Sequence, residues 1–427
     1  MKKLIKLSKK IYNDSMLKNS MYLILANFLS LALGFFFWMI ATRYYTPNDI
    51  GITSVILSSI SLISTTSLIG LPIALIFYLP AHRENANRII NSCMIIGIII
   101  STIFSLIFIS GIDIFMPKLQ LVLKDLGMII IFIITSILMT ISSLMTGAFS
   151  AGKRSSFHMI KENVAYVTKI FVLILLTGFG ITGIILSWSI GSMVASAVGF
   201  FLLFKLWKYV PTFIFDPIIK DMAVFSIGSH IAGTLYNIPK FIFPIMILNI
   251  ISAEYAGYFF ISMTVAGLLY GISYSISLSF LAESSDKDNF WKNVNKMIRF
   301  NVYLLVPGLL LFMIFGNFVL GIFNESYANK SLVTLIILSI ASVPISLIMI
   351  YNIINNAQKN VMAMIKINGM VAIMSIIFSI YLMKIWSIEG VAMAYLIANM
   401  VTVIFIIFRM KNPIEFVLKV FNGTLSR

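Results

Sequence analysis

Charged residues and cysteine are both scarce in this sequence. Asp, Glu, Lys and Arg together make up 11% of its 427 residues, whereas about a quarter of the residues in soluble domains are charged. Cys93 is the single cysteine, which excludes an internal disulfide framework and a cysteine-based metal site. Hydrophobic residues account for 60% of the chain, and the mean hydropathy is +1.01. This composition predicts a protein whose main solvent is lipid.

Catalytic and nucleotide-binding motifs are also missing. The sequence contains no GxxxxGK[ST] loop, no HExxH and no GxSxG, which are the local signatures of phosphate, zinc and acyl-transfer sites. Its polar segments are too short to build an ATPase or a catalytic domain between the apolar runs. We therefore expect a protein that is not an enzyme and that binds no cofactor and no metal.

Acidic residues are few as well. All 15 of them fall in loops or at the ends of apolar runs, so no buried carboxylate is expected as an obvious relay for a proton or a sodium ion. The 31 Lys and Arg residues are scattered between the apolar runs and form no single basic domain, which argues against a nucleic-acid partner. A cavity with cations and without acids favours an anionic cargo.

Long apolar runs are what the sequence has in abundance. A membrane-spanning helix needs about 20 apolar residues to cross roughly 30 Å of hydrocarbon. Twelve runs meet this length, or in the case of the short fifth run come near to it. They are Met21–Thr42, Gly51–Phe77, Ile89–Ile112, Leu126–Phe149, Val164–Thr177, Ile181–Phe204, Met222–Ile251, Tyr255–Leu281, Val294–Phe315, Ser331–Asn355, Val361–Met383 and Ile388–Arg409.

The positions of the basic residues predict the orientation of these spans. Counting the N-terminus and every second loop, 24 of the 31 Lys and Arg residues lie on one side of the membrane and five lie on the other. Loops that remain cytoplasmic carry the positive excess. We therefore expect a multi-pass protein of the cell membrane with a cytoplasmic basic N-terminus (1–20) and a cytoplasmic tail (410–427). The N-terminal segment lacks the apolar stretch and cleavage site of a signal peptide.

The two halves of the sequence also resemble each other. A shift of about 206 residues superposes Gly51 on Gly257, "AGKRSSFHMIK" (151–161) on "AQKNVMAMIK" (357–366) and "GITG" (180–183) on "SIEG" (387–390). Internal repeats of this kind mark a duplicated architecture. Six spans are an even number, so both copies enter the membrane from the same side. The sequence thus predicts an all-α polytopic membrane protein with two parallel six-helix repeats around a central cavity, over 21–210 and 211–409.

Several polar residues fall inside the predicted spans and are candidates for lining that cavity. The seventh span has one polar face, which contains His230, Asn237 and Lys240, and the first span carries a comparable stripe. Ionisable groups within a membrane are costly and are functional candidates by default. The candidate substrate-contacting residues are Lys240, His230, Asn237, Asn27, Lys169 and Arg43.

Each candidate also has a plainer interpretation. His230 can be a packing residue, and Lys169 can extend toward the membrane surface near the end of its helix. The Ser and Thr face of the second span is common in helix packing. In the stretch "ATRYYTPNDIGITS" (41–54), Arg43 can anchor the helix at the interface beside Tyr44 and Tyr45. Pro47 is expected to end the first helix, and Gly51 to begin the second with close packing.

Two stretches carry a resemblance to a known family. "RYYTPNDIGITS" (43–54) links the first two predicted helices, and "GLPIALIFYLP" (70–80) closes the second. In both stretches the chain resembles the polysaccharide or O-antigen flippases, which move lipid-linked oligosaccharides and belong to the multidrug/oligosaccharidyl-lipid/polysaccharide exporter superfamily. The family often has an arginine shortly before "LP", whereas this chain has Ile76, Phe77 and Tyr78 there.

The resemblance implies a flippase for surface polysaccharides such as lipopolysaccharide. It implies that a polyprenyl-diphosphate-linked oligosaccharide is moved from the cytoplasmic to the outer leaflet by alternating access. The expected partners are this lipid-linked substrate, membrane lipids, and a polysaccharide polymerase or glycosyltransferases, and the expected state is a monomer. Three alternatives stay open: a multidrug or ion-coupled exporter of the same superfamily, a transporter of the major facilitator type, and a membrane glycosyltransferase or polysaccharide polymerase.

Overall fold

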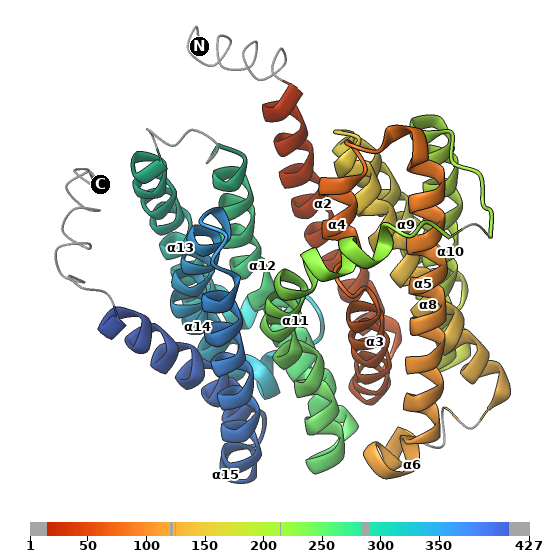
Figure 1. Ribbon diagram of the computed structural model, residues 1–427. Helices are drawn as coiled ribbons and strands as arrows, with labels where there is room; N and C mark the ends of the chain where they lie inside the picture. The colour runs from red at the N-terminus through yellow and green to blue at the C-terminus, as the bar shows by residue number, and fades with distance from the viewer. Residues whose placement is uncertain (1–14, 120–122, 124, 214, 284–289, 410–427) are drawn as a thin grey trace, which may run out of the picture. The chain divides into compact units, whose positions relative to one another are not determined.

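The computed structural model describes residues 15–119, 123, 125–213, 215–283 and 290–409, and every regular element within these ranges is helical (Figure 1). The short elements are α4 (Leu71–Tyr78), η1 (Arg83–Asn85), α6 (Ile112–Phe115), η2 (Pro117–Leu119) and η3 (Thr177–Phe179). The long helices are α2 (Ser15–Tyr44), α3 (Pro47–Ser67), α5 (Ala86–Ser110), α8 (Leu126–Ala151), α9 (Ser155–Leu175), α10 (Gly180–Trp207), α11 (Ile219–Ile250), α12 (Ala253–Glu283), α13 (Phe290–Gly321), α14 (Glu325–Ala357) and α15 (Val361–Arg409).

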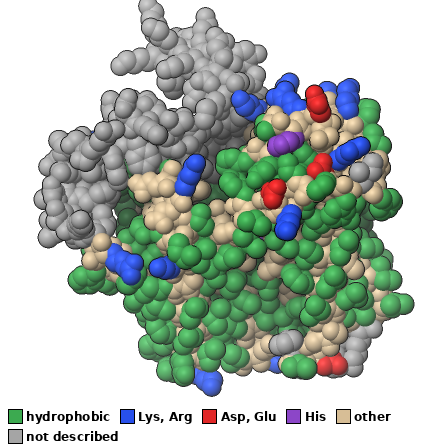
Figure 2. All heavy atoms as spheres, in the orientation of Figure 1, with side chains coloured by type: hydrophobic (Ala, Val, Ile, Leu, Met, Phe, Trp, Pro, Cys, Tyr) green, Lys and Arg blue, Asp and Glu red, His purple; other side chains and the backbone are tan. Residues whose placement is uncertain are grey.

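Helices cover all twelve predicted spans, and two of these helices, α2 and α9, are not among those that are long and apolar enough to cross a membrane. Within the described ranges, nine helices are long and apolar enough to cross a membrane. One of them, α15, covers two predicted spans, because its backbone leaves the helical conformation at Trp386 and Ser387. Helices suit lipid because each satisfies its own backbone hydrogen bonds. In Figure 2 hydrophobic side chains cover most of the visible face. The prediction of an all-α polytopic membrane protein is confirmed.

The second predicted span is not one continuous helix. It is divided into α3 and α4 at Ile69 and Gly70, whose φ angles are 44° and 82°. Backbone conformations with positive φ interrupt a right-handed helix. A Cβ atom at Gly70 would lie 2.8 Å from the backbone oxygen of Ser226 on α11. Glycine therefore allows both the turn and the close approach of α11.

The described chain forms two compact units. Unit 2 is Ala32–Gly257, and unit 1 contains the remaining residues, 1–31 and 258–427. Within unit 2, α3 packs against α5, α8, α10 and α11, and α9 packs against α8 and α10. Within unit 1, α14 packs against α13 and α15. The predicted repeats, which meet at residues 210 and 211, have other bounds than these two units, because a repeat reflects a duplicated sequence and a unit reflects dense packing. The division into repeats stays a prediction, and so does a cavity between them.

Helix α3 is the interior helix of unit 2. Most of its residues are buried, among them Ser54, Ser58 and Ser59. Two of these hydroxyl groups are paired with the helix backbone, because Ser59 donates a hydrogen bond to the carbonyl of Val55 at 2.8 Å, and Ser54 donates one to Gly51 at 2.7 Å. The N-terminal part of the Ser and Thr face therefore packs against neighbouring helices.

The turn between α2 and α3 is built by its polar residues. Thr46 and Asp49 form a capping box, in which each side chain accepts a hydrogen bond from the backbone of the other, and Pro47 is the first residue of α3. Such caps satisfy the free N–H groups at the start of a helix. Pro47 thus begins the second helix, and α2 has already ended at Tyr44.

The two tyrosines before this cap differ in environment. Tyr44 is 60% exposed, whereas Tyr45 is 6% exposed and its hydroxyl donates a hydrogen bond to the carbonyl of Leu176 at 3.1 Å. Burial, together with the Asp49 carboxylate, raises the pKa of Tyr45. The Tyr45 side chain therefore faces the protein interior, and a position at the depth of the membrane interface stays a prediction. Its hydroxyl reaches a carbonyl at the end of α9, a contact between residues distant in sequence.

The backbone repeats where the sequence repeats. Lys153 and Lys359, which are 206 positions apart, both have positive φ, at 54° and 59°. In both places the backbone N–H of the next residue donates a hydrogen bond to the carbonyl of the residue five positions before it. This hydrogen bond is typical of a helix C-terminus. Gly180 and Ser387 share a second unusual conformation, with φ of 55° and 50°. These paired conformations support the duplication inferred from the sequence.

The glycines matched by the duplication also meet in space. A Cβ atom at Gly51 would overlap the carbonyl oxygen of Ala253, and one at Gly257 would overlap that of Pro47. The first turns of α3 and α12 therefore approach each other backbone to backbone. The close packing predicted at Gly51 is confirmed.

The segment that joins α10 to α11 is held against α5 by hydrogen bonds. The side-chain oxygen of Asn91 accepts hydrogen bonds from the Tyr209 hydroxyl and from the backbone N–H of Thr212, both at 2.9 Å. Ser92 accepts a third, from the N–H of Asp216 at 2.8 Å. Burial raises the pKa of Tyr209 to about 12, so its hydroxyl keeps the proton that it donates. This connection is thus part of the packed structure of unit 2.

Candidate functional site

The six predicted site residues occupy different environments. Arg43 is exposed at the last turn of α2, and Asn27 is half-buried in the part of α2 that belongs to unit 1. Lys169 lies on α9, and His230, Asn237 and Lys240 lie on α11, all in unit 2. The structure therefore brings three of the six together on one helix and places Lys169 in a group of its own.

Lys169 lies between two aromatic rings. Its ammonium nitrogen is 3.9 Å from the centre of the Trp188 ring and 4.6 Å from that of Tyr166, and its side chain is 6% exposed. Gly191 makes room for this side chain, since a Cβ atom there would overlap the Lys169 Cγ. We call Tyr166, Lys169 and Trp188 the Lys169 cage. A cation over an aromatic face is stabilised by about 2 kcal/mol when it is desolvated.

The Lys169 cage contains hydrogen-bond donors that lack acceptors. In the part of the chain that the structure describes, the Lys169 ammonium has no carboxylate within ion-pair distance and no hydrogen bond. The buried indole N–H of Trp188 also has no acceptor there. Buried polar groups are normally satisfied, and an exception requires an explanation. Both groups can donate to an acceptor, which makes the cage suited to an anionic or oxygen-rich ligand.

On α11 the polar residues pair along the helix. Lys240 donates to the Asn237 side-chain oxygen at 3.4 Å, and its ammonium lies 4.5 Å from the centre of the Tyr236 ring. One turn before Asn237, the His230 ring and the Thr234 hydroxyl are 3.4 Å apart. Like Lys169, Lys240 has no ion-pair partner within the described ranges. The stripe of α11 is therefore a second place where a lysine rests against an aromatic ring without an acid.

A second buried lysine, besides Lys169, was missed by the sequence analysis. Lys161 was counted as a charge of a cytoplasmic loop, but it lies on α9 and its side chain is 0% exposed. Its ammonium donates to the Ser142 carbonyl at 2.7 Å, to the Ser142 hydroxyl and to the Thr146 hydroxyl at 3.3 Å. It also forms an ion pair with Glu162 at 2.9 Å. We call Ser142, Thr146, Lys161 and Glu162 the Lys161 site.

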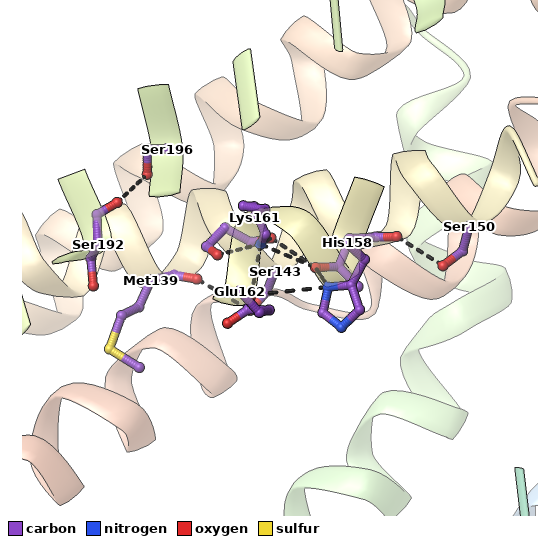
Figure 3. A network of polar contacts seen from close by, with 10 residues as sticks. Met139, Ser143, Ser150, His158, Lys161, Glu162, Ser192 and Ser196 are labelled. Atoms are coloured by element: carbon purple, nitrogen blue, oxygen red, sulfur yellow. Dashed lines mark hydrogen bonds and ion pairs between the residues drawn. The ribbon is translucent and has the colours of Figure 1, made fainter. Parts of the chain in front are cut away.

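Figure 3 shows Lys161 and Glu162 of this site, with His158 close by. The Nδ1 atom of His158 is 3.1 Å from the Thr146 hydroxyl and 3.9 Å from a Glu162 oxygen. The sequence contained a signal for this cluster, because residues three and four apart share a helix face. The ionisable residues at positions 158, 161 and 162 and the hydroxyl groups at 142 and 146 are spaced in this way. The signal was not used because the helix was expected to begin at Val164.

Unit 1 contains a cavity of about 500 Å³ between α14 and the break in α15. It is lined by Val333, Ile337, Ile385, Trp386, Ser387, Glu389 and Met393. Its walls are mainly apolar, and Glu389 is the one charged residue among them. Across the described ranges, no three His, Cys, Asp or Glu side chains are grouped to hold a metal ion. The cavity is therefore suited to an apolar group that carries a positive charge.

Solved structures with the same fold belong to membrane transporters. The lipid II flippase MurJ in an inward closed conformation is 17% identical, with a TM-score of 0.74 over 94% of this chain and 90% of that one. An inward-facing multidrug resistance transporter of the MATE family, of the MOP superfamily, is 14% identical, with a TM-score of 0.67 over 93% and 95%. A MOP superfamily transporter from Pyrococcus furiosus, described as having a binding pocket of reversed polarity, is 15% identical, with a TM-score of 0.56 over 97% and 98%. This chain therefore has the fold of the MOP superfamily.

The sequence itself matches one family. Comparison with curated proteins gives no significant match. The family described as "Polysaccharide biosynthesis protein" matches residues 16–259, which are more than half of the chain. The matched region includes the turn at 41–54, the Lys161 site, the Lys169 cage and the polar stripe of α11. The chain thus belongs to the polysaccharide biosynthesis protein family, as its two resembling stretches predicted.

Proposed function

We propose that this protein is a flippase that moves a polyprenyl-diphosphate-linked oligosaccharide from the cytoplasmic to the outer leaflet by alternating access. The family to which the chain belongs and its fold, shared with a lipid II flippase, support this proposal. In the proposal both termini are cytoplasmic and the transporting unit is a monomer. A polysaccharide polymerase or glycosyltransferases act before or after it in the assembly of a surface glycan such as O-antigen.

The observation that carries the proposal is the pair of lysines without acids in unit 2. Lys169 and Lys240 each lie against an aromatic ring, and neither has a carboxylate within ion-pair distance among the described residues. A buried ammonium without a counter-ion costs free energy. Within a membrane such a residue is retained for function more often than for stability. An anionic ligand supplies the missing counter-ion.

A diphosphate joined to a sugar matches the groups that surround these lysines. The phosphate oxygens accept charge-assisted hydrogen bonds from ammonium groups. Sugar hydroxyl groups both donate and accept, as do the Asn237 amide and the Thr234 hydroxyl. Without such a lining, the transfer of a hydrated headgroup through hydrocarbon is prohibitive. The polar groups of α11 thus support a ligand that is both anionic and rich in hydroxyl groups.

Lys240 provides the direct test. We expect Lys240→Ala and Lys240→Glu to abolish transport of a polyprenyl-diphosphate-linked saccharide across proteoliposomes, and Lys240→Arg to restore part of it. Surface glycan in cells should follow the same order at unchanged protein level. Lys384→Ala is the matched control, since Lys384 is an exposed lysine outside the polar stripe. Full transport by Lys240→Glu would refute the role of Lys240.

The cavity of unit 1 favours one second candidate, the export of cationic amphiphiles. Glu389 lines this apolar cavity and has no ion-pair partner in the described part of the chain. A carboxylate in an apolar wall attracts a cation that carries apolar groups. If the protein exports such compounds, cells that express it should lose a permeant cationic dye faster, and Glu389→Gln should remove the difference. Equal dye retention with and without the protein excludes this function.

A further inference from the structure

The oxygen atoms of the Lys161 site are of the kinds that bind a metal cation, and the Lys161 ammonium occupies the place of that cation. The ammonium is surrounded by four oxygen atoms: the Ser142 carbonyl, the Ser142 hydroxyl, the Thr146 hydroxyl and a Glu162 carboxylate oxygen. Carbonyl, hydroxyl and carboxylate oxygens are the ligands that hard metal cations prefer. The group they surround is fully shielded, because the Lys161 side chain is 0% exposed.

The charge of the site points to a monovalent cation. Glu162 contributes the one carboxylate, and the other three oxygens are neutral. One positive charge therefore balances the site, whereas divalent cations are usually bound by more carboxylates or by several waters. Potassium and methylammonium resemble the lysine ammonium in size and charge.

The second copy of the repeat lacks these features. At the 206-residue offset, Ile348 corresponds to Ser142 and Asn352 to Thr146. The second matched stretch is one residue shorter, so that Lys366 is the counterpart of Lys161; Lys366 is exposed, and Ile367 follows it in place of a glutamate. A lysine alone at this point of the repeat therefore does not require an oxygen site. The four oxygens around Lys161 belong to the first copy only.

We propose that Lys161 supplies an internal cation to an oxygen site between α8 and α9, and that this site binds a potassium or methylammonium ion once the lysine side chain is removed. The inference concerns a site outside the Lys169 cage and the polar stripe, and it does not depend on the proposed cargo. Its consequence for the natural protein is that α8 and α9 are joined by a cation that never leaves. Unit 2 therefore needs no sodium or potassium ion at this place.

Thermal unfolding of the purified full-length chain tests the proposal. Tm is measured for the natural protein and for Lys161→Ala in chloride solutions of choline, sodium, potassium or methylammonium at equal ionic strength. The natural protein should unfold at the same Tm in all four. Lys161→Ala should unfold at a lower Tm in choline, and saturating potassium or methylammonium should raise that Tm by about 3 °C, since a ligand stabilises the folded state that binds it.

Three further variants make the result specific. Lys161→Ala with Glu162→Gln, which lacks the carboxylate, should show no response to the cations. Lys366→Ala, at the matched position of the second copy, should behave like the natural protein. Lys161→Ser opens the same space and adds a hydroxyl group, so it replaces Lys161→Ala if that variant does not accumulate. A Tm of the opened variants that is the same in choline, potassium and methylammonium overturns the proposal, as does a Tm of the natural protein that rises with potassium.

Discussion

Two lysines on the same helix, Lys161 and Lys169, are buried in opposite ways. Lys161 has four oxygen atoms around its ammonium, one of them from Glu162. Lys169, two turns further along α9, has the rings of Tyr166 and Trp188, and no carboxylate of the described residues lies within ion-pair distance of it. The first lysine is satisfied by the fold, and the second is left with capacity for a ligand. Burial of a charged residue therefore does not by itself identify a site, and the partners decide its role.

The largest effect is expected where the satisfied lysine is removed. Lys161→Met leaves the Glu162 carboxylate without its counter-ion, and breaking one side of a buried ion pair costs about 3–5 kcal/mol. Tm of the purified protein should fall accordingly. Lys366→Met, at the exposed position of the second copy, should change stability by about 0.5 kcal/mol or less. Equal Tm values for the two variants would show that the oxygen atoms around Lys161 add nothing to the stability of the fold.

The unpartnered lysine should give the opposite pattern. Lys169→Gln should lower Tm less than Lys161→Met does, because it removes the contacts with the Tyr166 and Trp188 rings but breaks no ion pair. Transport of the diphosphate-linked saccharide should fall about 30-fold or more, since truncating one partner of a buried charge pair costs about 2–5 kcal/mol. Lys169→Arg keeps the charge and should retain part of the activity. A large drop in Tm together with full transport by the remaining folded protein would assign Lys169 a structural role.

The smallest effect is expected from the loss of one hydrogen bond in the Lys161 site. Thr146→Val keeps the shape of the side chain but removes the hydroxyl that accepts from Lys161 and lies 3.1 Å from His158. Loss of one such hydrogen bond costs about 1 kcal/mol. Urea or thermal unfolding should detect this loss, with transport unchanged. A cost as large as that of Lys161→Met would show that the hydroxyl, and not Glu162, dominates the site.

Much of the fold was predictable because the membrane leaves a chain few choices. Apolar runs long enough to cross the bilayer must be helices, and eleven of the twelve predicted spans coincide with a single helix or with one half of α15. The exception, the division of α3 from α4, depends on Gly70 lying against Ser226. Contacts between distant helices leave no periodic trace in the sequence. The burial of Tyr45 was missed for the same reason, since its partner is the carbonyl of Leu176.

The candidate site was predictable only in part. The polar face of α11 follows from helical spacing alone, and the structure pairs Asn237 with Lys240 and His230 with Thr234 along it. The roles of these residues in binding stay predictions. The Lys161 site was not foreseen, because its oxygen atoms come from α8 while its charges come from α9, and a count of loop charges treats Lys161 and Glu162 as solvated.

The sequence alone determined that the protein is a helical membrane protein and that it resembles flippases, because these properties depend on composition, run length and local motifs. The tertiary structure alone decided which lysine has an acid beside it and which has an aromatic ring. That distinction depends on which faces of α8, α9 and α10 meet. The free energy of a buried charge is set by the atoms within a few ångströms of it, and those atoms come from other helices.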